Sequence, residues 1–152
     1  MRIGLIADTH GLLRPEALHA LCGVDHIVHA GDVGRPDVLE RLWRVAPVTA
    51  VRGNVDHGAW ADRLPTTAEV ELGGAWFHVL HALEDLGLDP RAAGFDVVVH
   101  GHTHRPEIRR EKGVWLVNPG SAGPRRFRLP VSLAVAAVGP GGVEVALVDL
   151  AR

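Results

Sequence analysis

The sequence predicts a single α/β domain in which parallel strands come first, antiparallel strands follow, and helices lie on the outside. Three observations lead to this prediction. The first third alternates short apolar runs with helical patterns, and the order β-α-β-α-β favours parallel strands joined by right-handed crossovers. The later part has apolar runs joined by glycine-containing turns, which is typical of antiparallel hairpins. The chain has 152 residues, 47% of them hydrophobic, and no linker or repeat, so residues 1–152 are read as one domain.

The first part of the chain is expected to hold three buried strands and two helices. Apolar runs predict strands at residues 3–7, 25–30 and 47–52. Helices are expected at residues 15–21 and 36–44. Pro15 suits a first helical turn, where a missing N–H costs little. The second helix should turn four side chains toward the core, namely Val38, Leu39, Leu42 and Trp43.

The later part of the chain is expected to hold three hairpins and one central strand. The central strand is the β-branched run Val97–Val99. A loop or short turn is expected at residues 59–65 and one helical turn at residues 89–93. The hairpins are predicted at residues 69–72 with 76–80, 107–110 with 114–117, and 131–138 with 143–150.

Composition and charge exclude several classes of protein. The formal net charge of −2 gives no electrostatic reason to expect a nucleic-acid partner or a membrane surface. Residues 1–7 are too short for a signal sequence, and no apolar run reaches membrane-spanning length. Cys22 is the only cysteine, so a thiolate metal site is excluded. A cytoplasmic enzyme or binding domain fits these features, and the four tryptophans leave a homo-oligomer open.

Three histidines follow the central strand at alternate positions. Residues two apart on an extended segment point to the same side, so His102 and His104 should present their imidazoles to one point, together with His100 if the strand continues. Gly101 lets the backbone approach whatever the imidazoles face. Imidazole is the commonest protein ligand for transition metals. The alternative is a chance cluster of histidines on a solvated strand end.

Five predicted strands end in side chains that can bind metals. In open α/β sheets, ligands bind beyond the carboxyl ends of the strands. Nitrogen and oxygen donors without cysteine suit divalent cations, and seven donors are too many for a single zinc, so they favour two metals that share a carboxylate. Taken singly, these residues also suit helix caps, turns or a buried histidine. The seven are Asp8, His10, Asp32, Asn54, His81, His102 and His104.

The order of these motifs resembles that of the calcineurin-like metallophosphoesterases. The matching segments are Asp8-x-His10, Gly31-Asp32, Gly53-Asn54-x-Asp56, His81 and Gly101-His102-x-His104. The segment Asn118-Pro119-Gly120-Ser121 followed by Pro124-Arg125 is similar to the small, cap-less bacterial and archaeal phosphodiesterase branch. The resemblance implies a four-layer α/β/β/α sandwich of two facing mixed sheets.

The resemblance also implies a ligand set and a choice of metal. By motif, one cation would be held by Asp8, His10 and His104, and a second by Asn54, His81 and His102, with Asp32 bridging the two. The family typically uses manganese, iron, zinc or nickel, and two divalent ions, with Mn²⁺ first among them, are the expected cofactor.

Two such cations would lower the pKa of a shared water and provide a bridging hydroxide that attacks a phosphate they also bind. Asp32, Asn54 and His102 would then act through the metals. Many relatives have a histidine where this chain has Val55, so small or activated phosphodiesters are the expected substrates rather than monoesters. His57 is a possible substitute as the proton donor.

Further residues are candidates for roles around the ligands. Asp56 and Asn118 could orient the imidazoles by accepting a hydrogen bond. Arg125 and Arg126 could meet a substrate phosphate, or they could be solvated loop charges. His29 could be either structural or such an orienting residue. The alternative functions are a non-catalytic protein-interaction scaffold of the same fold, as in a eukaryotic retromer subunit, and a phosphomonoesterase.

Overall fold

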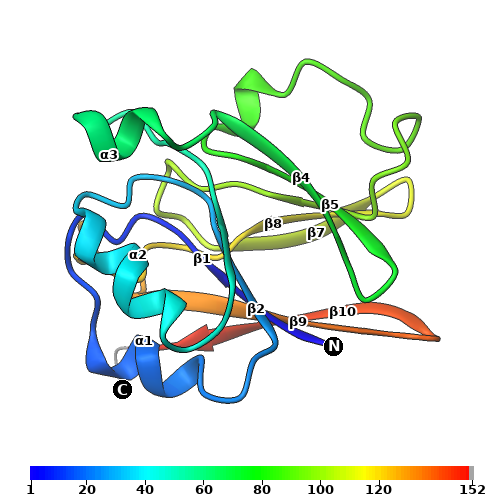
Figure 1. Ribbon diagram of the computed structural model, residues 1–152. Coiled ribbons are helices and arrows are strands. Elements are labelled where there is room, and N and C mark those ends of the chain that lie inside the picture. The colour runs from blue at the N-terminus through cyan, green and yellow to red at the C-terminus, as the bar shows by residue number, and fades with distance from the viewer. Residues whose placement is uncertain (151–152) are drawn as a thin grey trace.

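Two five-stranded sheets pack face to face in the computed structural model, which describes residues 1–150 (Figure 1). The first sheet has the order β10-β9-β1-β2-β3 and the second has the order β4-β5-β6-β8-β7. The first comprises β1 (Arg2–Ile6), β2 (His26–His29), β3 (Val48–Ala50), β9 (Ser132–Gly139) and β10 (Gly142–Asp149). The second comprises β4 (Thr67–Leu72), β5 (Ala75–Leu80), β6 (Val97–Val99), β7 (Glu107–Glu111) and β8 (Val114–Asn118).

Both sheets are mixed, as the resemblance implied. Strands β1, β2 and β3 are parallel, with Ile3 beside His26 and Ile27 beside Val48, and β9 is antiparallel to β1. The expectation that parallel pairing stops after the first third is wrong, because β5, β6 and β8 also run parallel. The β7–β8 hairpin was predicted correctly. However, the pairing of β8 with β6 joins distant segments, and a local pattern does not reveal it.

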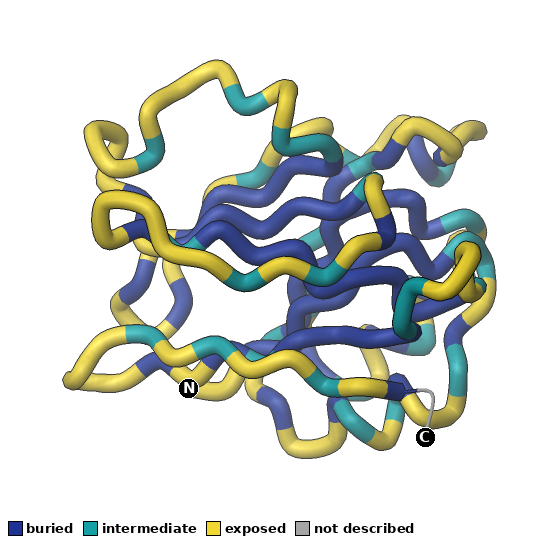
Figure 2. Tube along the Cα trace, turned by 180° about the vertical axis from the view of Figure 1, so that it is seen from behind, coloured by how far each residue is buried: buried dark blue, intermediate teal, exposed yellow. Residues whose placement is uncertain are grey.

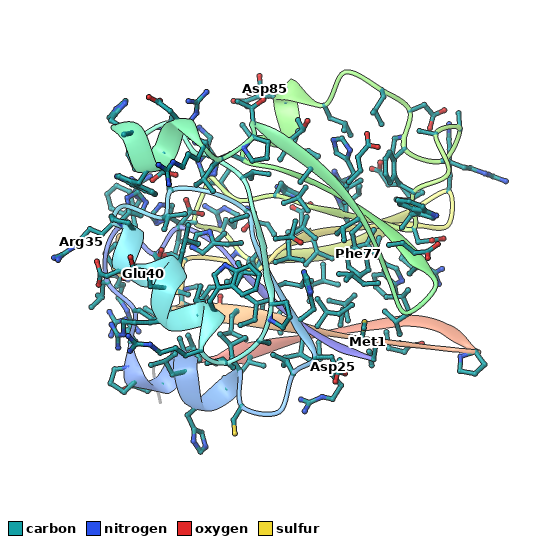
Figure 3. All side chains as sticks on the ribbon, viewed as in Figure 1. Met1, Asp25, Arg35, Glu40, Phe77 and Asp85 are labelled. Carbon is teal, nitrogen blue, oxygen red and sulfur yellow. The ribbon has the colours of Figure 1, made fainter. Side chains whose placement is uncertain are left out.

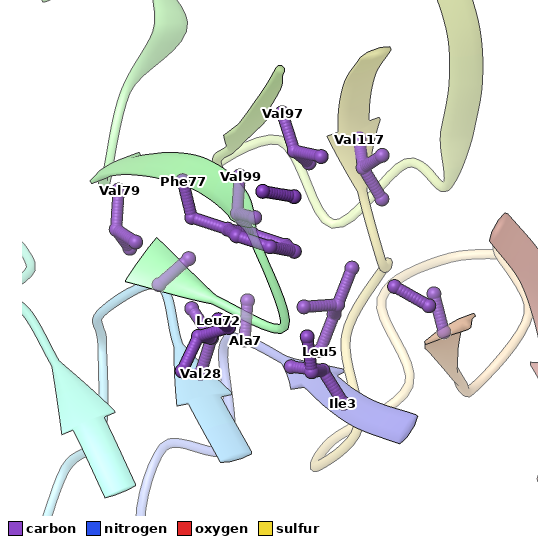
Figure 4. Packing of buried hydrophobic residues seen from close by; sticks show 14 of the residues in the cluster. Ile3, Leu5, Ala7, Val28, Leu72, Phe77, Val79, Val97, Val99 and Val117 are labelled. Carbon is purple, nitrogen blue, oxygen red and sulfur yellow. The ribbon is translucent and has the colours of Figure 1, made fainter. Parts of the chain in front are cut away.

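The main hydrophobic core lies between the two sheets (Figure 4). Phe77 of β5 is its largest fully buried side chain and points from the second sheet toward the first. Alternation along β6 explains why all three of its valines are buried: Val97 and Val99 face the first sheet, and Val98 belongs to a cluster on the outer face. Figure 2 shows the same pattern, with buried strands surrounded by exposed loops.

The two outer layers are unequal. Helices α1 (Pro15–Ala20) and α2 (Pro36–Trp43) cover the first sheet and contribute to a second core cluster. The second sheet is covered by a single 3₁₀ turn, η1 (Leu83–Asp85), and the segment after it: Leu83 and Leu86 pack on Leu80, Val98, Val114 and Leu116. The fourth layer of the sandwich is therefore thin. A short helix, α3 (Ala59–Asp62), follows β3.

One local prediction is confirmed and one is wrong. Residues 89–93 form the single helical turn that was expected, with Ala93 N donating to Asp89 O at 3.0 Å, and a further 3₁₀ turn that was not predicted lies earlier, at η1. Trp43 is 57% exposed rather than in the core. Val38 and Leu42 are four apart and share the buried face of α2, whereas Trp43, one residue further, is rotated by about 100° out of it.

Among the described residues, no helix is long and apolar enough to cross a membrane.

Candidate metal centre

The seven predicted donors lie on the loops that follow five strands. Asp8 and His10 follow β1, Asp32 follows β2, Asn54 follows β3, and His81 directly follows β5. His102 and His104 lie in the loop after β6. Two groups within this set have ligand atoms that all lie within 4.8 Å of one another, and Asp8 belongs to both. They are Asp8 with His10 and His104, and Asp8 with Asp32 and His81.

The first group is a triangle of one carboxylate and two imidazoles. His10 Nε2 lies 3.1 Å from His104 Nε2, and these two atoms lie 3.8 Å and 3.6 Å from Asp8 Oδ1. Metal–ligand bonds of about 2.1 Å place neighbouring ligands about 3.0 to 3.4 Å apart. The triangle is therefore close to the size that a first-row divalent cation requires.

The second group brings His81, Asp32 and Asn54 together. His81 Nε2 lies 3.1 Å from Asp32 Oδ2, and Asn54 turns its amide oxygen toward both residues, where it faces only acceptors. With the amide reversed, its nitrogen would lie 3.0 Å from His81 Nε2 and 3.2 Å from Asp32 Oδ2. If the Asn54 amide oxygen points toward Asp32 and His81, the site suits a bound cation. If the amide nitrogen points there, the three side chains are joined by hydrogen bonds instead. The ring of His102 lies edge-on to His81, with 5.2 Å between the ring centroids.

The two carboxylates join the groups. Asp32 Oδ2 lies 3.6 Å from His10 Nε2 as well as 3.1 Å from His81 Nε2. Asp8 Oδ1 lies 3.9 Å from His81 Nε2, and this oxygen is buried without a hydrogen-bond partner among the described residues. A buried carboxylate oxygen with no donor is costly unless a cation or a proton satisfies it. The donor set thus fits the two-cation site that the resemblance implied.

The backbone at the centre is left-handed at five of the seven donors. The φ values are 54° at Asp8, 47° at His10, 54° at Asp32, 77° at His102 and 63° at His104. Non-glycine residues rarely adopt this conformation, and where they do, it often marks a functional site. The reason given from the sequence for the convergence of His102 and His104 is therefore wrong, because β6 ends at Val99 and the loop, not an extended strand, aims both rings.

Two glycines allow the loops to approach one another. A Cβ built on Gly53 would lie 2.1 Å from the backbone nitrogen of Asp32, and one on Gly101 would lie 2.8 Å from Asp8 Oδ2. Any side chain at Gly53 would separate the loop of Asn54 from the loop of Asp32.

Hydrogen bonds fix the orientation of the donors. His81 Nδ1 donates to the carbonyl of Ala30 at 2.8 Å, so its Nε2 faces the cluster. Asp8 Oδ2 accepts from the backbone N–H of His102 at 3.0 Å, and Asp32 Oδ1 accepts from that of Val55 at 3.0 Å. The carboxylate oxygens that remain are the ones that face the imidazoles.

Burial controls the protonation of the cluster. It raises the pKa of Asp8 to about 7 and lowers the pKa of His104 to about 4, and it also lowers the pKa of His10. At Asp32 burial acts to raise the pKa, but the bonds from His81 and Val55 N–H outweigh it and lower the pKa. At His81 burial acts to lower the pKa, but Asp32 and the Ala30 carbonyl raise it overall. His10 and His104 are thus neutral imidazoles, the form that binds metals.

Asp56 and Asn118 hold loops rather than imidazoles. Asp56 accepts backbone N–H groups from Gly34 at 2.8 Å, Gly53 at 2.8 Å and Val33 at 3.2 Å, which ties the loop of Asp32 to the loop of Asn54. Asn118 Nδ2 donates to the carbonyl of Gly101 and to Thr103 Oγ1, both at 3.1 Å. Within residues 1–150, the hydrogen bonds of both side chains join loop groups and none reaches a ligand histidine, so the expectation that they accept from one is wrong.

The residues missed from the sequence are Thr9 and Ser121. Thr9 Oγ1 donates to the carbonyl of Val33 at 2.9 Å and lies 3.0 Å from His29 Nε2, whose Nδ1 accepts from the N–H of Gly31 at 3.1 Å. His29 is thus structural. Ser121 Oγ lies 3.0 Å from the carbonyl of Asp8. The position of Thr9 between two donors was the one available signal.

Four other candidates lie outside the cluster. His57 is exposed, and within residues 1–150 no hydrogen bond or ion pair joins it to the donors. Arg125 and Arg126 are both exposed, but the charge of Arg126 acts on Asp8, His10 and His104 by lowering their pKa values. His100 is buried, its pKa is lowered to about 4 by burial, and it lines a hollow behind His102 rather than the donor cluster.

A model of the "Calcineurin-like phosphoesterase superfamily domain" matches residues 1–140. The chain belongs to this superfamily. A "Probable metallophosphoesterase" of Methanothermobacter thermautotrophicus is 38% identical over 136 residues, which cover 80% of this chain and 77% of that protein. The family gives divalent-metal phosphoesterase as the general class of the protein, and the structure brings together residues that could hold a metal ion.

Solved structures share the fold over nearly the whole chain. A structure described as a novel archaeal phosphodiesterase has a TM-score of 0.80 at 22% identity, covering 97% of this chain and 100% of that one. Vps29 of Entamoeba histolytica in complex with Zn²⁺ has a TM-score of 0.75 at 21% identity, covering 99% of both chains. At these identities the likeness establishes the two-sheet fold.

Proposed function

We propose that the chain is a metal-dependent phosphodiesterase that acts on small or activated phosphodiesters. One cation is held by Asp8, His10 and His104, a second by Asn54, His81 and His102, and Asp32 is shared. The observation that carries the proposal is the meeting of these donors around Asp8 Oδ1, which lies 3.8 Å from His10 Nε2 and 3.6 Å from His104 Nε2 and is buried without a hydrogen-bond partner in residues 1–150. Manganese is the first candidate, and iron, zinc and nickel suit the same donors.

Bound divalent cations would activate a water as the nucleophile and neutralise charge on the phosphate. The protein itself has three tasks. Buried loops hold the donors in place, the N–H groups of His102 and Val55 keep each carboxylate oriented, and Arg126 adds positive charge at the rim. Val55 has no proton to give and His57 lies outside the cluster, so a departing alkoxide receives no proton from either side chain. Esters with good leaving groups therefore suit the site, and among these the resemblance to the small phosphodiesterase branch favours diesters over monoesters.

The test compares bis(p-nitrophenyl) phosphate with p-nitrophenyl phosphate, after chelation and reloading with manganese. We expect a kcat/KM that favours the diester. A clear preference for the monoester refutes the choice of phosphodiesters, and no turnover of either compound refutes an enzyme that acts on activated esters.

A non-catalytic scaffold is the second candidate, and the likeness to Vps29 favours testing it. Because that protein is itself described as a zinc complex, metal content alone does not separate the two functions. Turnover with loaded metal decides between them.

A further inference from the structure

A hollow of about 460 Å³ opens beside the second group of donors. Asn54, His81 and His102 form one wall. Thr66 and Thr67, at the start of β4, lie on its rim together with Arg52 from the end of β3 and Glu84 and Asp85 from η1. A phosphate placed at the donors would therefore direct one of its ester groups into this hollow.

The chemistry of the lining is that of a binding site for hydroxyl groups. Two threonines, two acidic residues and one arginine line it together with the apolar residues Leu80 and Ala82. In residues 1–150, neither the Thr66 nor the Thr67 hydroxyl is hydrogen-bonded to another protein group. No Phe, Tyr or Trp lines the hollow, so a nucleobase or aryl ring would find no partner for stacking.

The rim is held in place by contacts of its own. The backbone N–H of Arg52 donates to the carbonyl of Pro65 at 2.8 Å, and Arg52 Nη1 lies 3.4 Å from Asp62 Oδ1. On the other side, Leu83 and Leu86 anchor η1 on the outer face of the second sheet, which leaves Glu84 and Asp85 exposed (Figure 3). The hydroxyl and carboxylate groups are therefore presented by anchored segments.

We propose that this hollow binds a hydroxyl-rich ester arm, such as a glycerol or sugar group, so that the enzyme prefers polyol phosphodiesters. The inference rests on the proposed function and specifies its substrate class. Thr66 and Thr67 donate to or accept from the arm, and Glu84 and Asp85 accept its hydroxyl protons. The two carboxylates could also bind an ester arm that carries an amine, but the positive charge of Arg52 would repel such an arm.

The experiment uses mixed diesters that share a p-nitrophenyl leaving group and differ in the other arm: glycerol, phenyl, thymidine or ethanolamine. With manganese-loaded protein, we expect the glycerol diester to have a kcat/KM about tenfold above that of the phenyl diester. In the T66V/T67V variant this ratio should fall about tenfold, mainly through KM, because two hydrogen bonds to the arm are lost. A higher value for the phenyl or thymidine diester overturns the proposal.

Removing the charge of Glu84 distinguishes binding of a polyol arm from binding of an amine arm. Glu84→Gln keeps an acceptor, so the preference for glycerol should change less than threefold, whereas an amine arm would lose its partner. Preference for the ethanolamine diester that disappears in E84Q overturns the proposal. Glu40→Gln, on the exposed face of α2 (Figure 3), is the matched control and should leave all four rates unchanged.

A binding measurement keeps this inference distinct from the proposed function. Calorimetry with glycerol phosphate and with phenyl phosphate should give tighter binding of the former, and this difference should be lost in T66V/T67V. If no diester is hydrolysed but glycerol phosphate still binds selectively, the proposed function fails and the subsite stands. If diesters are hydrolysed with no selectivity for the polyol in rate or binding, the subsite fails and the proposed function stands.

Discussion

The two groups of donors differ in how far they are enclosed. In the first group Asp8 is fully buried and His104 is 2% exposed, whereas the His10 side chain is 21% exposed and its Nε2 lies 3.1 Å from His104 Nε2. In the second group Asn54 is exposed, His102 is half-buried, and both line the hollow. Ligands that are enclosed on all sides hold a cation tightly, whereas an open side admits a substrate oxygen. The comparison suggests one firmly held cation and one that exchanges and meets the substrate.

The largest expected effect comes from the residue that joins the two groups. Asp32→Ala should remove both cations and lower the kcat/KM for a diester by on the order of 10³-fold or more, since each metal supplies several kcal/mol of charge stabilisation. Metal content after gel filtration and diester kinetics measure this. The control is Asp37→Ala, which removes a carboxylate from an exposed ion pair on α2. Retention of two cations by the Asp32 variant would show that the groups are independent.

Removing one ligand from each group tests the difference in enclosure directly. We expect the wild type to retain about two manganese ions per chain at saturation, the Asn54→Ala variant about one, and the His104→Ala variant to lose the tighter of the two. Titration of metal-free protein with Mn²⁺, followed by elemental analysis, gives the numbers and affinities. The assignment of the tighter cation to the first group is contradicted if Asn54→Ala abolishes the tighter binding and His104→Ala leaves it intact.

Asp56 should affect both groups without touching a cation. Asp56→Ala leaves three backbone N–H groups without their acceptor, so the loops of Asp32 and Asn54 should loosen, with a loss of about 10- to 100-fold in metal affinity. The melting temperature should also fall by several degrees. Calorimetric titration and thermal denaturation measure the two effects, and Asp56→Asn, which keeps one acceptor oxygen, should lie between the variant and the wild type.

The smallest effect is expected at the rim beside the first group. Arg126→Ala should raise the KM for a diester a few-fold at low salt, and the difference should shrink as the ionic strength rises, because the side chain is exposed and screened. Arg44→Ala, at the end of α2, is the control. An effect that is independent of salt would indicate direct contact with the phosphate instead.

The sequence predicted which donor residues would come together but not how they are held. Donors at the ends of strands were recognisable because parallel strands bring their carboxyl ends to one edge, and Asp8, Asp32 and Asn54 confirm that reasoning by lying on adjacent loops. The left-handed conformations of His102 and His104 were not visible, because they depend on loops that contact one another only in the folded state. The motif placed Asp56 near the site, but its hydrogen-bond partners are backbone N–H groups, which cannot be identified from residue types.

In the fold, too, the sequence predicted local features but not those that depend on distant contacts. Alternation of apolar residues located β1, β2 and the hairpin β7–β8 to within a residue or two. The sequence did not predict the order of strands in the second sheet or the helical turn at η1. Both depend on what covers Val98 and Leu116 rather than on local periodicity.

The left-handed donors have a consequence for how the protein would evolve or be engineered. Each of the five non-glycine residues in this conformation costs on the order of 1–3 kcal/mol, which glycine would largely avoid. Selection for heat resistance would therefore favour glycine at Asp8 or His104, and selection for turnover would forbid it. In a descendant that no longer needed the reaction, we expect these positions to be substituted first, with a gain in stability as the activity is lost.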